Sequence, residues 1–221
     1  MISGDRLYEL DSTRLEILTK VLPTYGEAAR PLDLFEKSFP EIFALPVRRD
    51  FENWWLVGYF NYDENATAIK DLDLTRLGLD PGKTYLIYEF WSQHLVAETN
   101  RSVSLSFGPS SVNLLAIREK KGVPQLLGTD RHYTQGGIEV ENVHWDESKH
   151  TFSGKAQGAP ATAWKLAIYI PDSYSWNEDP PDLFHDYQGY SAVSYEERIL
   201  RANLNFIGTN SVDWTFRFKR I

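Results

Sequence analysis

Hydrophobic and polar residues alternate along much of the chain from Trp54 onward. Val103, Leu105 and Phe107 alternate with serines, and Leu166 and Ile168 show the same spacing. A period of two places successive side chains on opposite faces of a strand, so that one face packs and the other meets water. The pattern recurs at Ile170, at Leu200, Ala202, Leu204 and Phe206, and at Val212, Trp214, Phe216 and Phe218. Many short strands separated by Gly, Pro and Asp turns predict a mainly β fold, an antiparallel β-sandwich.

Three further segments complete the predicted strand plan. Ile138 and Val140 alternate with glutamates, which predicts a strand whose glutamates face solvent. Residues 208–211 (GTNS) are expected to form a hairpin loop between the final two strands. Residues 171–190 are acidic and aromatic, and a loop of this length is either mobile or functional.

Before Trp54 the pattern differs. Leu15, Leu18 and Leu22 fall on one stripe of a 3.6-residue period, and Pro23 cannot continue a helix, so a short amphipathic helix is expected over residues 12–22. Asp11 or Ser12 would cap it. Because so short a helix is marginal alone, its stripe must pack on something. Residues 30–47, rich in Pro and Phe, are interpreted as a wrapping connector.

Composition narrows the function. The 221 residues include no cysteine, which excludes disulfides and cysteine-based chemistry. The net charge of −8 disfavours a nucleic-acid partner, which would require Lys and Arg clusters. The one basic run, residues 118–121 (REKK), is interpreted as a solvated turn. No apolar run would span a membrane and the N-terminus lacks the features of a signal peptide, so the sequence indicates no compartment.

Several motifs in order resemble one known module. They are W-x-V-G-x-F-N at residues 55–61, LDLTRLGLDPGKTYLIYEFW at 72–91, PSSVNLLAIR at 109–118, LLGTDRHYTQGGIEV at 126–140 and VDWTFRF at 212–218. Together they resemble the C-terminal β-sandwich of α-galactosidase-like (melibiase-like) glycoside hydrolases. The resemblance covers most of residues 45–221 and rests on the order and spacing of the motifs.

The N-terminal part resembles the end of the catalytic (β/α)8 barrel of those enzymes. ISGDRL would finish the last barrel strand, and residues 12–22 would form the last barrel helix. The resemblance thus implies a barrel remnant and connector over residues 1–47, and a C-terminal β-sandwich domain over residues 48–221. It places the catalytic carboxylates on earlier barrel strands, outside this chain, and leaves only Asp5 near the substrate-side rim.

The polar cluster Asp130-Arg131-His132 is the most suggestive one for chemistry, since a carboxylate can orient an imidazole. No strained serine elbow accompanies it, so a network that braces the sandwich or its barrel contact is favoured. The acidic pairs Asp71/Asp73 and Asp146/Glu147 are better explained as solvated edges and turns. Histidine spacing matches no metal motif, and no cofactor is expected.

Aromatic residues offer another route to function, because sugars stack on exposed rings. Trp54 and Trp55 are adjacent in an expected strand and must point opposite ways. One is expected in the core, and the other would face a ligand or the barrel. Trp91 and Trp176, with the pair Tyr187/Tyr190, are further carbohydrate-binding candidates, although rings more often fill a core or a domain interface.

Three hypotheses follow. The first is a non-catalytic accessory domain that packs on and stabilises a catalytic barrel. Its exposed apolar patch would lie beside residues 12–22 and 54–60, and a homodimer would be one way to cover it. The second is a carbohydrate-binding module that uses exposed aromatic residues. The third is an independent enzyme built around Asp130 and His132, which would require a cleft with converging carboxylates or histidines.

Overall fold

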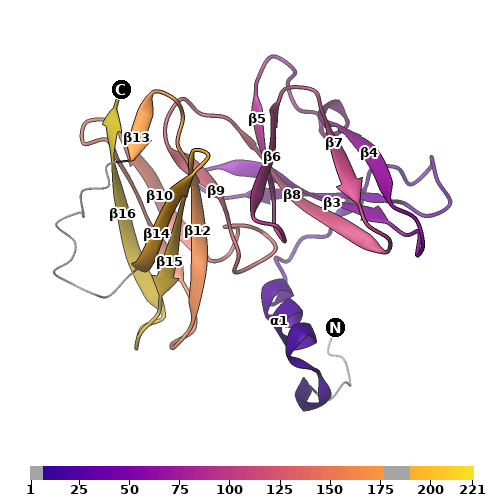
Figure 1. Ribbon diagram of the computed structural model, residues 1–221, viewed down its shortest axis with the longest axis horizontal. Coiled ribbons are helices and arrows are strands. Elements are labelled where there is room, and N and C mark those ends of the chain that lie inside the picture. Colours follow the sequence, from indigo (N-terminus) through magenta and orange to yellow (C-terminus); the bar gives the residue numbers. More distant parts are fainter. Residues whose placement is uncertain (1–6, 177–189) are drawn as a thin grey trace.

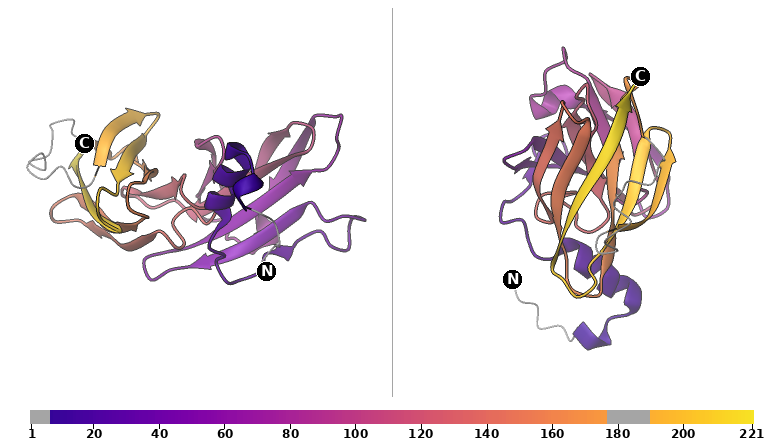
Figure 2. Two further views of the ribbon diagram at one scale, coloured as in Figure 1. Left: turned by 90° about the horizontal axis from the view of Figure 1, so that it is seen from below. Right: turned by 90° about the vertical axis from the view of Figure 1, so that its left-hand side faces the viewer.

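The computed structural model describes residues 7–176 and 190–221 and shows a mainly β protein with one short α-helix near its N-terminus (Figure 1). The expectations for residues 2–5 and for most of the 171–190 loop lie outside the described residues. The strands form two layered units, which lie at opposite ends of the molecule. The helix projects between these units (Figure 2). The antiparallel, mainly β fold predicted from the alternation is confirmed.

The predicted N-terminal helix is also confirmed. A 3-10 turn, η1 (Leu7–Glu9), precedes α1 (Ser12–Val21). The side chain of Asp11 accepts a hydrogen bond from the backbone N–H of Arg14 at 2.9 Å and so caps the helix. Pro23 follows the C-cap residue Leu22 and prevents further helix. Within the described part of the chain, no helix is long and apolar enough to cross a bilayer.

The N-terminal unit, residues 30–119, is a six-stranded antiparallel sheet in the order β1-β2-β3-β8-β5-β6, covered on one face by the pair β4-β7. Its core fills the space between these layers. Its elements are β1 (Arg30–Pro31), β2 (Ile42–Arg48), β3 (Asn53–Asn61), β4 (Ala68–Asp73), the 3-10 turn η2 (Leu74–Leu77), β5 (Tyr85–Glu89), β6 (His94–Thr99), β7 (Ser102–Phe107) and β8 (Ser111–Glu119).

The C-terminal unit, residues 125–220, packs the sheet β10-β11-β16-β13 against the sheet β14-β15-β12-β9. The alternating apolar residues of β12, β15 and β16 are buried between these sheets, as their spacing predicts. Its elements are β9 (Gln125–Thr129), β10 (Val140–Asp146), β11 (Thr151–Gln157), β12 (Ala163–Tyr169), β13 (Tyr174–Trp176), β14 (Tyr190–Glu196), β15 (Ile199–Asn205) and β16 (Ser211–Arg220).

The connections differ from the expected plan in two places. Residues 30–47, expected to be a connector, contain β1 and most of β2, so the expected domain boundary after residue 47 falls inside a strand of the six-stranded sheet. Residues 208–211 do not close a hairpin, because β15 pairs with β12 and β14 whereas β16 pairs with β11 and β13. The loop instead carries the chain from one sheet of the sandwich to the other.

Two charged residues expected at the surface are buried. Arg118 belongs to β8 and is fully enclosed, so the interpretation of residues 118–121 as a solvated turn is wrong at its first position. Glu139 precedes β10 and is only 4% exposed. Its carboxylate accepts hydrogen bonds from the backbone N–H groups of Gly136 (2.8 Å) and Ile138 (3.1 Å), which offset its burial.

Candidate functional site

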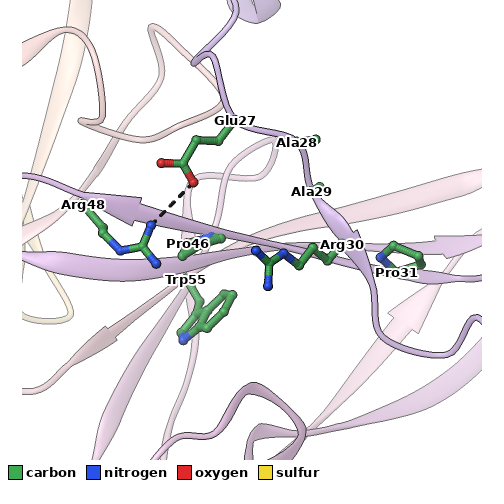
Figure 3. Close-up of a pocket in the computed structure, with 8 residues that line it drawn as sticks. All are labelled: Glu27, Ala28, Ala29, Arg30, Pro31, Pro46, Arg48 and Trp55. Atoms are coloured by element: carbon green, nitrogen blue, oxygen red, sulfur yellow. Dashed lines mark ion pairs between the residues drawn. The ribbon is translucent and has the colours of Figure 1, made fainter.

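A pocket of about 450 Å³ opens beside Trp55 on the N-terminal unit (Figure 3). Segment 27–31 forms one wall, and β2 and β3 supply the rest. Its volume lies in the range typical of small-molecule sites. The lining residues are Glu27, Ala28, Ala29, Arg30, Pro31, Pro46, Arg48 and Trp55.

The strand register explains why the pocket lies there. Residues opposite each other in an antiparallel pair share a face of the sheet. Val57 opposes Ala44, and both are buried beneath β4 and β7. Trp55 opposes Pro46 one step further along the same face, beyond the most deeply buried part of that core, and is only partly buried. The ring therefore forms part of the pocket wall.

The polar groups of the pocket are unevenly paired. Arg48 Nη1 lies 3.5 Å from Glu27 Oε2, and both side chains are about half exposed or more, at 64% and 48%. Among the described residues, the guanidinium of Arg30 makes neither a hydrogen bond nor an ion pair. Figure 3 shows Arg30 and Arg48 reaching toward each other near Pro46, with the Trp55 ring beside them. The pocket therefore combines an aromatic surface with an available cation.

Trp54 points away from the pocket, as the alternation requires. It is 3% exposed, and its indole N–H donates to the backbone carbonyl of Thr134 at 3.1 Å. The guanidinium of Arg118 stacks on the face of the Trp54 ring. Trp54 is thus a core residue that joins β3 to the loop after β9.

The other tryptophan candidates lie apart from the pocket. Trp91 is 42% exposed and packs edge-on against Phe90, at the end of β5. Trp176 is half-buried in β13 and packs on the core of the C-terminal unit. The structure therefore does not bring the four tryptophans together. Tyr187 lies outside the described residues, as does the side chain of Tyr190.

The Asp130-Arg131-His132 segment attaches the end of α1 to the rest of the molecule. Arg131 Nη1 donates to the backbone carbonyl of Thr19, and the backbone N–H of Tyr133 donates to that of Lys20 at 2.9 Å. His132 Nε2 lies 2.9 Å from the backbone carbonyl of Pro23. We call residues 131–133, with their partners at positions 19, 20 and 23, the helix anchor.

His132 is almost completely buried, and its contacts fix its tautomer. A carbonyl oxygen only accepts, so Nε2 must carry the proton that is donated to Pro23. Nδ1 is then an acceptor, 3.3 Å from the backbone N–H of Thr134 and 2.7 Å from its hydroxyl. Burial lowers the pKa of His132, and the nearby carboxylate of Glu139 only partly opposes this. The neutral imidazole is a structural link at this position.

Asp130 does not pair with this imidazole. Its carboxylate accepts a hydrogen bond from the backbone N–H of Lys165 in β12 at 2.6 Å. Asp130 therefore contacts β12, whereas Arg131 and His132 contact the end of α1. A carboxylate–imidazole pair for catalysis, the arrangement that the sequence left open, is not formed by Asp130 and His132.

The helix itself packs loosely. Among the described residues of α1, none is fully buried. Leu15, Leu18 and Val21 are half-buried, while Ile17 is 45% exposed and Leu22, directly after the helix, is 46% exposed. The sequence predicts an exposed apolar patch beside residues 12–22 and 54–60. Ile17 and Leu22 are exposed in the first segment, whereas residues 54–60 are all buried or half-buried, so the second segment contributes no exposed side chain.

A second, polar pocket of about 360 Å³ lies between the β5–β6 turn and the β14–β15 turn. It contains His94, Glu196 and Glu197, together with Arg201, which donates to the backbone carbonyl of Gln93 at 2.8 Å. Both glutamates are exposed.

Sequence reasoning missed Glu27, Arg30 and Arg48 as site residues. These residues form no recognisable sequence motif, and only the pairing of β1 with β2 brings them beside Trp55.

In the part of the chain that the structure describes, no group of three or more His, Asp or Glu side chains is arranged to hold a metal ion. No protein-family profile matches the sequence, and no curated protein matches it.

Proposed function

We propose that this chain is the non-catalytic accessory part of an α-galactosidase-like glycoside hydrolase, in which it packs on and stabilises a catalytic (β/α)8 barrel. The observation that supports this most is α1, a ten-residue helix attached at its C-terminal end, with none of its side chains fully buried. Isolated helices of this length are marginal in water, so α1 gains stability from a further packing partner.

The helix anchor fits this role. It holds the end of α1 on the segment between β9 and β10 of the C-terminal unit, and the Trp54–Thr134 hydrogen bond links the same segment to β3 of the N-terminal unit. A barrel that contacts α1 would therefore be braced by both units.

The test uses the complete gene product and compares two surface changes. We expect that product to hydrolyse p-nitrophenyl α-galactoside, and Ile17→Glu, at a position of α1 that is 45% exposed, to shorten its half-life at elevated temperature several-fold. Ile207→Glu adds the same charge in the segment between β15 and β16, at a position that is 71% exposed, and should leave the half-life unchanged. Hydrolysis by the 221-residue chain alone, abolished by one substitution within it, would contradict the proposal.

A second function is favoured by the Trp55 pocket, namely carbohydrate binding. A partly exposed indole beside two prolines and two alanines offers an apolar surface for the C–H face of a sugar ring. A panel of oligosaccharides titrated against tryptophan fluorescence tests it. Saturable quenching that disappears in Trp55→Leu supports a binding site, and flat titrations across the panel remove this function.

A further inference from the structure

From the charges of the Trp55 pocket we infer that its ligand is an acidic saccharide, a pyranose that carries a carboxylate. The inference rests on the carbohydrate-binding function proposed above and adds the class of sugar. Two guanidinium groups, from Arg30 and Arg48, line the pocket against one carboxylate, from Glu27. The pocket is therefore locally positive on a protein whose net charge is −8.

Arg30 is the group that selects the ligand. Its side chain is exposed, lines the pocket and has no hydrogen-bond or ion-pair partner among the described residues. A guanidinium presents a planar fork of donors that matches the two oxygens of a carboxylate. Trp55 lies close enough to line the same pocket, so the carboxylate and the apolar face of one sugar ring would be contacted together.

Arg48 and Glu27 supply the second half of the site. Their ion pair is 3.5 Å long and largely exposed, and such pairs contribute little on their own. Arg48 is therefore free to turn toward an anionic ligand, while Glu27 accepts hydrogen bonds from sugar hydroxyls.

The test compares two disaccharides of the same linkage that differ at C6, where digalacturonic acid carries a carboxylate and galactobiose a hydroxymethyl group. We expect digalacturonic acid to bind the chain about tenfold more tightly than neutral galactobiose, as charge-assisted hydrogen bonds predict. The preference should shrink as salt is raised. Isothermal titration calorimetry measures the two affinities and their dependence on salt. Citrate and inorganic phosphate serve as anions without a sugar face.

Variants at Arg30 separate charge from geometry. Arg30→Gln should lose most of the preference for digalacturonic acid, since only Arg48 remains to contact a carboxylate, and Arg30→Lys should keep a larger part of it, although a lysine has no fork. Arg217→Gln removes the same charge from an exposed position of β16 and should bind as the wild type does. Thermal melting verifies that each variant is folded.

The outcomes separate the inference from the function beneath it. Equal binding of the two disaccharides by the wild type overturns the acidic class and leaves carbohydrate binding intact. If the wild type binds neither disaccharide, both the acidic-sugar inference and the carbohydrate-binding function are wrong. Citrate or phosphate binding as tightly as digalacturonic acid shows a plain anion site and overturns the inference. None of these results bears on the barrel contact of α1, which is tested separately.

Discussion

The guanidinium carbon of Arg118 lies 3.7 Å from the centre of the Trp54 ring, in the interior of the molecule. Arg118 comes from β8 and Trp54 from β3, and neither strand belongs to the C-terminal unit. The same guanidinium donates to the backbone carbonyls of Leu127 (3.0 Å) and Gln135 (2.6 Å), and both of these residues belong to the C-terminal unit. One buried side chain thus joins the two units.

Replacement of Arg118 should therefore destabilise the whole chain. Its Nη1 lies 2.5 Å from Glu52 Oε2, so Arg118→Leu would leave a buried carboxylate with only the longer contact to Lys121 (3.2 Å). We expect the free energy of unfolding to fall by about 3 kcal/mol or more, as when one partner of a buried ion pair is removed. Urea unfolding followed by tryptophan fluorescence measures the change. Arg217→Leu, at an exposed position, should cost less than about 0.5 kcal/mol, and an equal loss in both variants would refute this role.

Gly154 in β11 offers a test of packing in the C-terminal unit. A Cβ at this position would clash with Cζ2 of Trp214, whose side chain is only 1% exposed. Gly154→Ala should reduce the free energy of unfolding by about 1–3 kcal/mol through overpacking. Gly122→Ala is the matched control, because a Cβ there would meet nothing within 4 Å. A neutral result at Gly154 would mean that the Trp214 ring shifts easily.

Much of the fold could be predicted from the sequence because its signal is local. The alternation at Val103, Leu105 and Phe107 sets which face is buried, whatever the strand later pairs with. The helix ends are equally local, since Asp11 caps one end and Pro23 follows the other. These features depend on neighbours within a few residues.

What could not be predicted depends on contacts between distant residues. Arg118 appears as the start of a basic run, yet its partners Glu52 and Gln135 are remote in sequence. Segment 208–211 has the composition of a hairpin loop, but sheet pairing decides that it crosses between sheets. In the candidate pocket, the sequence singled out Trp55 by its ring, while Arg30 becomes visible only through the pairing of β1 with β2.

The apolar contact between the units should make them unfold together. Leu127 of β9 is fully buried in a cluster with Leu86 and Tyr88 of β5 and with Tyr169 of β12. We expect Leu127→Ala to cost about 2–5 kcal/mol and to split one denaturation transition into two. Leu204→Ala removes the same side chain from the core of the C-terminal unit, where Leu204 is also 0% exposed. Leu204→Ala should lower the midpoint of denaturation but keep a single transition. A single transition in both variants would show that Leu127 is not needed for the coupling.

The helix anchor should respond to acidification through His132. Burial lowers the pKa of this imidazole in the folded chain, whereas in the unfolded chain it titrates near its ordinary value of about 6.5. As the pH falls below that value, the unfolded chain binds the proton first, so the stability present at neutral pH is progressively lost until the pH reaches the folded pKa. The group that faces His132 with negative charge is Glu139, and Arg131 opposes it. Protonation would also turn Nδ1 into a donor and remove the hydrogen bond that it accepts from Thr134.

His132→Gln isolates this contribution, because glutamine keeps a donor and an acceptor but does not titrate. We expect the stability of the wild type relative to His132→Gln to fall below pH 6.5 with a slope of at most about 1.4 kcal/mol per pH unit. Hydrogen exchange of the backbone amides of residues 19–25 should accelerate over the same range, since the anchor holds this segment. If the difference in the free energy of unfolding between wild type and His132→Gln stays constant from pH 7.5 to 5, the folded and unfolded chains bind the proton equally well at His132. The link between the burial of His132 and the stability of the anchor would then be wrong.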